Sequence, residues 1–192
     1  MNDRVYACRE GSNLFVRGVG RITAHHCPAL RQWAEREFAS GAKKAYVYFC
    51  DCEYFDSTCM GTLLNLQRVF TVPGGVTLIA PSLACVDILD HMHTRRMFEI
   101  LPEFSPPANA EWKPLECDVQ RVGRTAFSKN VQEAHEVLAE VPSPLAPRFR
   151  MVAAAVAKEL EASEPQANEP KAKESDGEET VTFTSKRKPP PA

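Results

Sequence analysis

The run Ala45-Tyr-Val-Tyr-Phe-Cys50 constrains the fold of this chain more than any other segment, because none of its six positions carries a charged side chain. Successive residues of a β-strand point to opposite faces of the sheet, so a strand that is apolar at consecutive positions must be covered on both faces. The run therefore predicts a central strand in a layered α/β domain.

Strand and helix patterns alternate on both sides of this run, from residue 1 to about residue 104. Val5–Cys8 and Leu14–Val19 predict two short strands joined as a hairpin. Helices are expected to begin at Pro28, Ser57 and Ser82, and further strands at Val76–Ala80 and Met97–Ile100. The resulting order, β-β-α-β-α-β-α-β, implies right-handed crossovers. We therefore expect a small mixed, largely parallel β-sheet with helices on one face.

The composition changes in the last quarter of the chain. More than half of the 15 prolines lie within residues 141–192, and from Ser163 onward the only large apolar residues are Val181 and Phe183. A segment so poor in apolar side chains cannot bury enough surface to offset the entropy lost on ordering. Residues 163–192 are therefore predicted to form a disordered charged tail, which either remains solvated or docks on a charged partner.

Two helical patterns precede the tail and predict a helical extension over 125–162, joined to the first domain by a connector over 105–124. Asn130 and Glu133 have the spacing of a capping box. In Phe149–Leu160 the apolar residues recur at helical spacing and form one stripe that must be covered. This stripe either docks on the main domain or contacts a partner, including a second copy in a homodimer.

The overall charge is close to neutral, with 23 Lys+Arg against 25 Asp+Glu, which disfavours a nucleic-acid-binding protein. No apolar run approaches the roughly 18 residues that a membrane-spanning helix needs, and the polar N-terminus does not read as a signal peptide. The seven cysteines are scattered and do not form a disulfide framework. We therefore expect a cytoplasmic protein without a membrane span.

The polar residues that follow the central run are the strongest functional candidates. Asp56, Ser57 and Thr58 stand between the predicted strand and an apolar helix. Functional side chains of open α/β sheets gather at the carboxyl ends of strands. Considered alone, however, Asp-Ser-Thr before a helix is a capping signature, because short side-chain oxygens accept the free N–H groups of the first turn.

The segment Asp56-Ser-Thr-Cys-Met-Gly61, followed by Thr62-Leu-Leu, resembles the STAS domain of bacterial anti-sigma-factor antagonists, whose motif is Asp-Ser-Ser/Thr-Gly-Leu-Gly before an apolar helix. The resemblance extends over roughly residues 3–104 and implies a STAS domain over 1–104. Cys59 and His93 occupy positions where the family has glycine.

The resemblance implies a binding switch that regulates transcription and has no catalytic activity or cofactor of its own. Ser57 corresponds to the phosphoacceptor, and Thr58 is the second candidate. Asp56, Ser57, Thr58, Cys59 and Thr62 would form the partner-binding surface. The implied partners are an anti-sigma factor that is also a serine protein kinase and a PP2C-like phosphatase that reverses the modification. This mechanism requires the Ser57 hydroxyl to stand uncovered.

Two alternatives remain open from the sequence. The first is a STAS interaction module without a phosphoswitch, acting as a scaffold or a lipid-transport accessory. The second is a thiol-based redox sensor, in which the first helical turn lowers the pKa of Cys59. Metal binding is not expected, because three short clusters have poor ligand spacing: Cys50-Asp-Cys52, His25-His26-Cys27 and His91-Met-His93.

Overall fold

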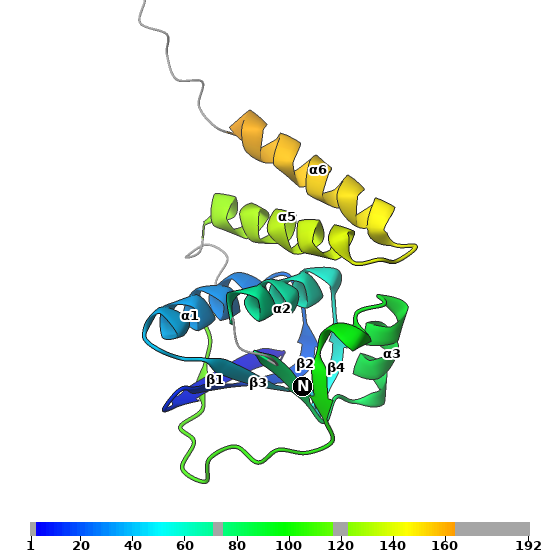
Figure 1. Ribbon diagram of the computed structural model, residues 1–192. Coiled ribbons are helices and arrows are strands. Elements are labelled where there is room, and N and C mark those ends of the chain that lie inside the picture. Colours follow the sequence, from blue (N-terminus) through cyan, green and yellow to red (C-terminus); the bar gives the residue numbers. More distant parts are fainter. Residues whose placement is uncertain (1–2, 71–74, 117–122, 164–192) are drawn as a thin grey trace, which may run out of the picture.

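The computed structural model describes residues 3–70, 75–116 and 123–163 (Figure 1). Its strands are β1 Arg4–Glu10, β2 Asn13–Ile22, β3 Lys44–Tyr48, β4 Cys52–Phe55, β5 Val76–Ile79, β6 Glu99–Leu101 and β7 Lys113–Pro114. Its helices are α1 Cys27–Ala39, α2 Ser57–Val69, α3 Leu83–His91, the 3-10 turn η1 Arg95–Met97, α5 Arg124–Glu140 and α6 Ala146–Ser163. The segment 164–192, which holds almost all of the predicted tail, lies outside the described residues.

The described strands form a mixed sheet in the order β6-β5-β3-β2-β1-β7, with β4 pairing with β2 beyond the end of β3. The pairs β2–β3, β2–β4, β3–β5 and β5–β6 are parallel, whereas β1–β2 and β1–β7 are antiparallel. The predicted hairpin is confirmed, since Glu10 pairs with Asn13 across a turn in which Gly11 adopts φ +57°.

The central strand β3 is covered on both faces, as its sequence predicts. Ala45 and Val47 belong to the main hydrophobic core. Tyr48, which points the other way, joins a smaller cluster with Phe15 and Ile79. No helix covers this second face in the described part of the chain; instead Trp112 of the segment after β6 packs edge-on against the Tyr48 ring, at 6.1 Å between centroids.

Helices α1, α2 and α3 all contribute to the main core, so they lie on one face of the sheet (Figure 1). Leu30 of α1, Leu63 of α2 and Leu89 of α3 are buried there. The helix starts expected at Pro28, Ser57 and Ser82 are confirmed to within one residue. The predicted fold class is therefore confirmed: a small, largely parallel α/β sheet with helices on one face, followed by a helical extension.

Two strand boundaries differ from the prediction. The chain turns after β3, with Asp51 paired to Arg17 at 2.6 Å, and then forms β4, a strand that was not predicted. Helix α2 therefore follows β4 rather than the central strand itself. The last predicted strand is displaced, because Arg95–Met97 forms a 3-10 turn and β6 begins only at Glu99.

The helical extension covers the helical layer of the domain, since α5 lies across α1 and α2 and α6 lies on α5 (Figure 1). The expected capping box at Asn130 is wrong: α5 begins at Arg124, and Asn130 is a buried residue of its interior. The stripe on α6 is covered in cis only in part: Phe149 and Ala153 are buried against α5, whereas Val152 of the same stripe is exposed.

Candidate functional site

Asp56 fixes the start of α2 with both of its carboxylate oxygens. Oδ1 accepts a hydrogen bond from the backbone N–H of Cys59 at 2.9 Å, which caps the helix. Oδ2 accepts from the backbone N–H of Ala24 at 2.8 Å, in the loop that leads into α1. The capping role expected of Asp56 is confirmed, and the same side chain also joins two helix starts.

Ser57 is the first residue of α2, and its Oγ lies 3.0 Å from Nε2 of His135 on α5. The other ring nitrogen of His135, Nδ1, lies 2.8 Å from the carbonyl oxygen of Val131. A carbonyl oxygen can only accept, so Nδ1 carries the proton and donates. In the neutral imidazole Nε2 is then an acceptor, and the Ser57 hydroxyl donates to it.

In this conformation the Ser57 hydroxyl is therefore only partly uncovered, whereas the phosphoswitch calls for an uncovered one. Ser57 is partly buried, and the His135 side chain that binds it is 5% exposed. No sequence signal marked His135, because it stands within the helical extension, and periodicity does not show which element a helical face will meet. The structure brings this residue to the motif from the helical extension, 78 positions further along the chain.

The three other candidate residues of the motif are buried, and they face different neighbours. Thr58 is 4% exposed, while Thr62 is 1% exposed and donates its hydroxyl to the carbonyl oxygen of Thr58 at 2.8 Å. The amide of Asn130 on α5 donates in turn to Oγ1 of Thr62 at 3.3 Å. Cys59 is 1% exposed and belongs to the main core. In this conformation none of the three offers a free surface to another protein.

The environment of Cys59 contradicts a reactive thiol. A hydrogen bond with Cys27, together with burial, raises the pKa of the Cys59 thiol. A sensor cysteine needs the opposite, an accessible thiol with a lowered pKa. The lowered pKa considered for a redox sensor is therefore wrong, and Cys59 acts as a small core residue at the place where the STAS motif has glycine.

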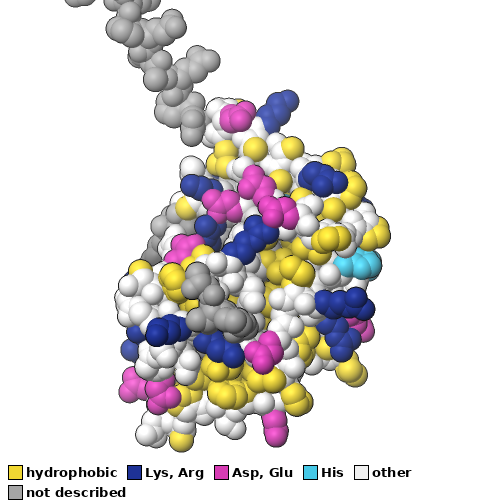
Figure 2. All heavy atoms as spheres, viewed as in Figure 1, with side chains coloured by type: hydrophobic (Ala, Val, Ile, Leu, Met, Phe, Trp, Pro, Cys, Tyr) yellow, Lys and Arg dark blue, Asp and Glu magenta, His cyan; other side chains and the backbone are white. Residues whose placement is uncertain are grey.

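Other features of the described residues do not form a second centre of chemistry. No group of three His, Cys, Asp or Glu side chains within residues 3–70, 75–116 and 123–163 is placed to hold a metal ion. None of the helices in these same ranges has the length and hydropathy needed to cross a bilayer. On the face shown in Figure 2, acidic and basic side chains are interspersed.

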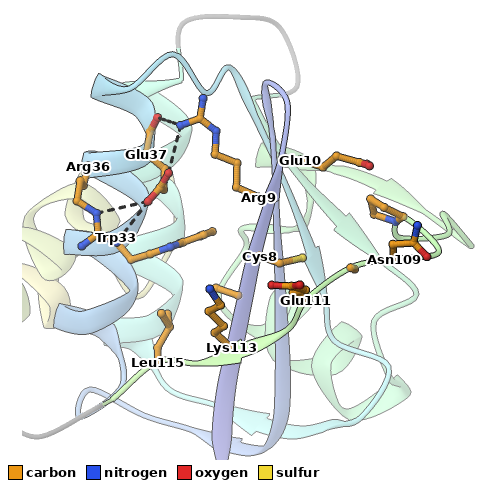
Figure 3. A pocket seen from close by; sticks show the side chains of 13 residues that line it. Cys8, Arg9, Glu10, Trp33, Arg36, Glu37, Asn109, Glu111, Lys113 and Leu115 are labelled. Carbon is orange, nitrogen blue, oxygen red and sulfur yellow. Dashed lines mark hydrogen bonds and ion pairs between the residues drawn. The ribbon is translucent and has the colours of Figure 1, made fainter.

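A cavity of about 680 Å³ lies between β1, α1 and residues 107–115 (Figure 3), and Ser57 is not among the residues that line it. Its charged side chains partly neutralise one another: Arg9 forms an ion pair with Glu37 at 3.1 Å, and Arg36 pairs with the same carboxylate at 3.3 Å. Trp33 is the large aromatic side chain of its wall. The cavity lacks a cluster of free like charges that would select one ligand chemistry.

Comparison with known proteins gives similarity to solved structures only. No protein-family model and no curated protein matches the chain. The structure of the anti-sigma factor antagonist SpoIIAA in its unphosphorylated form is similar, with a TM-score of 0.46 and 17% identity, over 52% of this chain and 89% of that chain.

The Bacillus cell fate determinant SpoIIAA in its phosphorylated form is similar as well, with a TM-score of 0.42 and 16% identity, over 51% of this chain and 92% of that chain. The similarity spans about half of this chain.

Proposed function

We propose that this protein is a binding protein of the anti-sigma-factor-antagonist type, controlled by phosphorylation of Ser57. In its unphosphorylated form it binds an anti-sigma factor that is also a serine protein kinase. That kinase transfers the γ-phosphoryl group of ATP to Ser57 Oγ, with release of ADP and the hydroxyl proton. A PP2C-like phosphatase removes the phosphate. Thr58 is the second candidate acceptor, but its burial makes it the less accessible of the two.

The observation that carries this proposal is the position of Ser57 at the first residue of α2, beside the Asp56 cap. A phosphate adds a charge of about −1.5 to −2 at neutral pH. The helix N-terminus favours an anion, so the first turn of α2 itself tolerates the phosphate. A partner that docks on a neutral hydroxyl would instead meet an unmatched charge, at a cost of about 2–5 kcal/mol.

We infer that this role involves no catalysis by the chain itself. The Ser57–His135 distance is within the range of a nucleophile and its base. A catalytic serine, however, also needs a space beside it in which substrate and developing charge are held. The 680 Å³ cavity lies elsewhere, and its wall contains neither residue.

A second candidate is a scaffold without a phosphoswitch, either in a signalling complex or as a lipid-transport accessory. The hydrogen bond that holds the Ser57 hydroxyl against a buried histidine supports this alternative. If α5 never leaves that position, the Ser57 hydroxyl stays bonded to His135 rather than free for a kinase, and the chain would act through its remaining surfaces. These include α6, where the exposed Met151 and Val152 would serve a homodimer.

Capture of partners from a bacterial lysate by the full-length chain tests the switch. Unaltered chain, Ser57→Ala and Ser57→Asp are immobilised in parallel, and captured proteins are identified by mass spectrometry. The proposal expects an anti-sigma factor with the first two and at least a tenfold loss with Ser57→Asp. Equal capture by Ser57→Ala and Ser57→Asp would leave the scaffold as the function. Phosphopeptide mapping of the purified chain gives an independent readout, since the scaffold carries no phosphate on Ser57 or Thr58.

A further inference from the structure

Helix α5 approaches α2 so closely that their backbones touch. The contact lies at Gly61, where an added Cβ would overlap the carbonyl group of Ala134. Ala134 itself is fully buried. A pair of small residues at the crossing point therefore sets the distance between the two helices, and any larger residue at either position would keep them apart.

The contact between α5 and α2 includes three polar pairs. Ser57 bonds to His135, Thr62 accepts from Asn130 at 3.3 Å, and the Asn65 amide donates to the carbonyl oxygen of Glu133 at 3.2 Å. Thr62, Asn130 and His135 are three of the six buried polar residues of the described ranges. Each of these groups can bond to water once separated, so this polar part of the contact costs less to open than apolar contacts of the same area.

The rim of this contact is complementary in charge. Arg31 of α1 pairs with Glu133 of α5, and Arg68 of α2 pairs with Glu140 of α5 at 2.5 Å. At these two pairs the domain supplies arginines and α5 supplies carboxylates; α5 as a whole carries Glu133, Glu136 and Glu140 against Arg124 and Lys129. With Val137 and Leu138 packed into the core between them, α5 lies on the domain as an amphipathic acidic helix lies in a groove.

We infer that the α1–α2 face is a docking site for an acidic amphipathic helix, and that α5 is its occupant in cis, so a partner helix binds by displacing α5. This inference rests on the proposed function, because it names the regulation of the same surface. While α5 is docked, Ser57 is held by His135 and Thr62 is covered. The partner helix requires a small residue opposite Gly61 and carboxylates facing Arg31 and Arg68.

Displacement lowers the apparent affinity of any partner in proportion to the small fraction of chains that are open. A tethered helix also competes at an effective concentration in the millimolar range. Undocking α5 by mutation is therefore expected to increase the affinity of a helix for this face by tenfold or more.

A peptide of residues 124–140 tests the site without any knowledge of the natural partner. The fluorescently labelled peptide is titrated with the full-length chain and with full-length Ala134→Glu, in which α5 cannot approach Gly61. Ala134→Glu is expected to bind the peptide at least tenfold more tightly than the unaltered chain. Glu136→Ala, at an exposed position of the same helix, should behave as the unaltered chain. A peptide that itself carries Ala134→Glu should not bind.

Equal binding of the peptide by Ala134→Glu and by the unaltered chain would overturn the inference. Loss of the folded sheet in Ala134→Glu, seen by circular dichroism, would also overturn it, because α5 would then be an integral part of the domain. Hydrogen exchange on the unaltered chain supplies a second measurement. The amides of α5 are expected to exchange at least tenfold faster than those of β3. Equal protection of the two segments would contradict a helix that can leave the α1–α2 face. Neither measurement uses an anti-sigma factor, so failure of the proposed function would leave these results intact.

Discussion

Ser57 Oγ and His135 Nε2 lie within hydrogen-bonding distance, 3.0 Å, although 78 positions separate the two residues in the chain. Ser57 belongs to the Asp-Ser-Thr motif at the start of α2, and His135 to the helical extension. The extension therefore reaches the residue on which a phosphoswitch would depend, and the state of α5 and the state of Ser57 are coupled.

This coupling is measurable as an interaction free energy. We expect Ser57→Ala and His135→Ala each to lower the free energy of unfolding, with a coupling of about 1 kcal/mol between them, the usual net contribution of one hydrogen bond. Urea unfolding of both single variants and the double variant gives this value. Glu136→Ala, at the neighbouring exposed position, is the control and should show no coupling with Ser57→Ala. Strict additivity of the Ser57 and His135 changes would mean that the hydrogen bond contributes nothing in solution.

Gly61→Ala should destabilise the protein, although alanine normally improves a helix interior by about 1 kcal/mol. The new Cβ meets the backbone of Ala134, which cannot move aside as a flexible side chain could. We expect a loss of about 1–3 kcal/mol in unfolding free energy, with faster hydrogen exchange in α5. Arg68→Ala, which removes only an exposed ion pair of the same helix, should change stability by less than about 1 kcal/mol. A stabilising Gly61→Ala would show that the two helices are not in contact.

The layered sheet could be predicted because each of its signals is local. The apolar run at Ala45–Cys50 indicates a strand buried on both faces, and Asp56 and Ser82 are caps whose side chains bond to backbone three residues away. Strand β4 was missed because its register depends on β2, more than 30 residues earlier in the chain. The cover on the second face was missed for the same reason, since it depends on Trp112 reaching Tyr48.

Only the part of the candidate site that depends on neighbouring residues in the chain, the start of α2, could be predicted from the sequence. The residue types at 56–58 indicate a helix start and an accessible hydroxyl, and the first of these is confirmed. Whether the hydroxyl is accessible depends on where α5 docks. A stripe of apolar residues in the sequence does not show which surface it will pack against. Gly61 was the one usable signal, because a glycine inside a helix often marks a close approach of another backbone.

Tyr48 should make stability depend on pH in the alkaline range. Its hydroxyl is the one buried side-chain polar group without a hydrogen-bond partner in the described part of the chain, and burial raises the pKa of Tyr48 to about 12. The unfolded chain, with the ordinary value near 10, loses this proton first, so stability is full below pH 10 and falls as pH rises from 10 towards 12.

Tyr48→Phe should flatten this decline and leave stability at neutral pH unchanged or higher by up to about 1 kcal/mol, because a buried unpaired hydroxyl is removed. Tyr46→Phe, on the same strand, is the control and should retain the decline, since Tyr48 is still present. Chemical unfolding at pH 9, 10 and 11 measures the slope. If Tyr48→Phe and the unaltered chain show the same slope, the alkaline decline in stability comes from other groups.

Alkylation of the native chain should separate the cysteines by burial. Cys50 is exposed, whereas Cys27, Cys52, Cys59 and Cys85 are buried. We expect iodoacetamide at pH 8 to modify Cys50 while the four buried thiols remain unmodified, as measured by peptide mass spectrometry. Labelling in denaturant is the control and should modify all five. Modification of Cys59 ahead of Cys50 would restore the thiol sensor as a function, because it requires an accessible thiolate.

His93→Gly should stabilise the protein, because His93 adopts φ +58°, a left-handed conformation that disfavours a side chain with a Cβ. His93 is one of the two positions where the STAS pattern that this chain resembles has glycine. The gain is expected to be about 0.5–1 kcal/mol, since glycine relieves the strain but increases the entropy of the unfolded chain. His91→Gly, at the last residue of α3, is the matched control and should lose a similar amount, because its backbone is helical. Thermal unfolding of both variants compares them directly, and equal losses in the two would show that the left-handed backbone at His93 carries no strain.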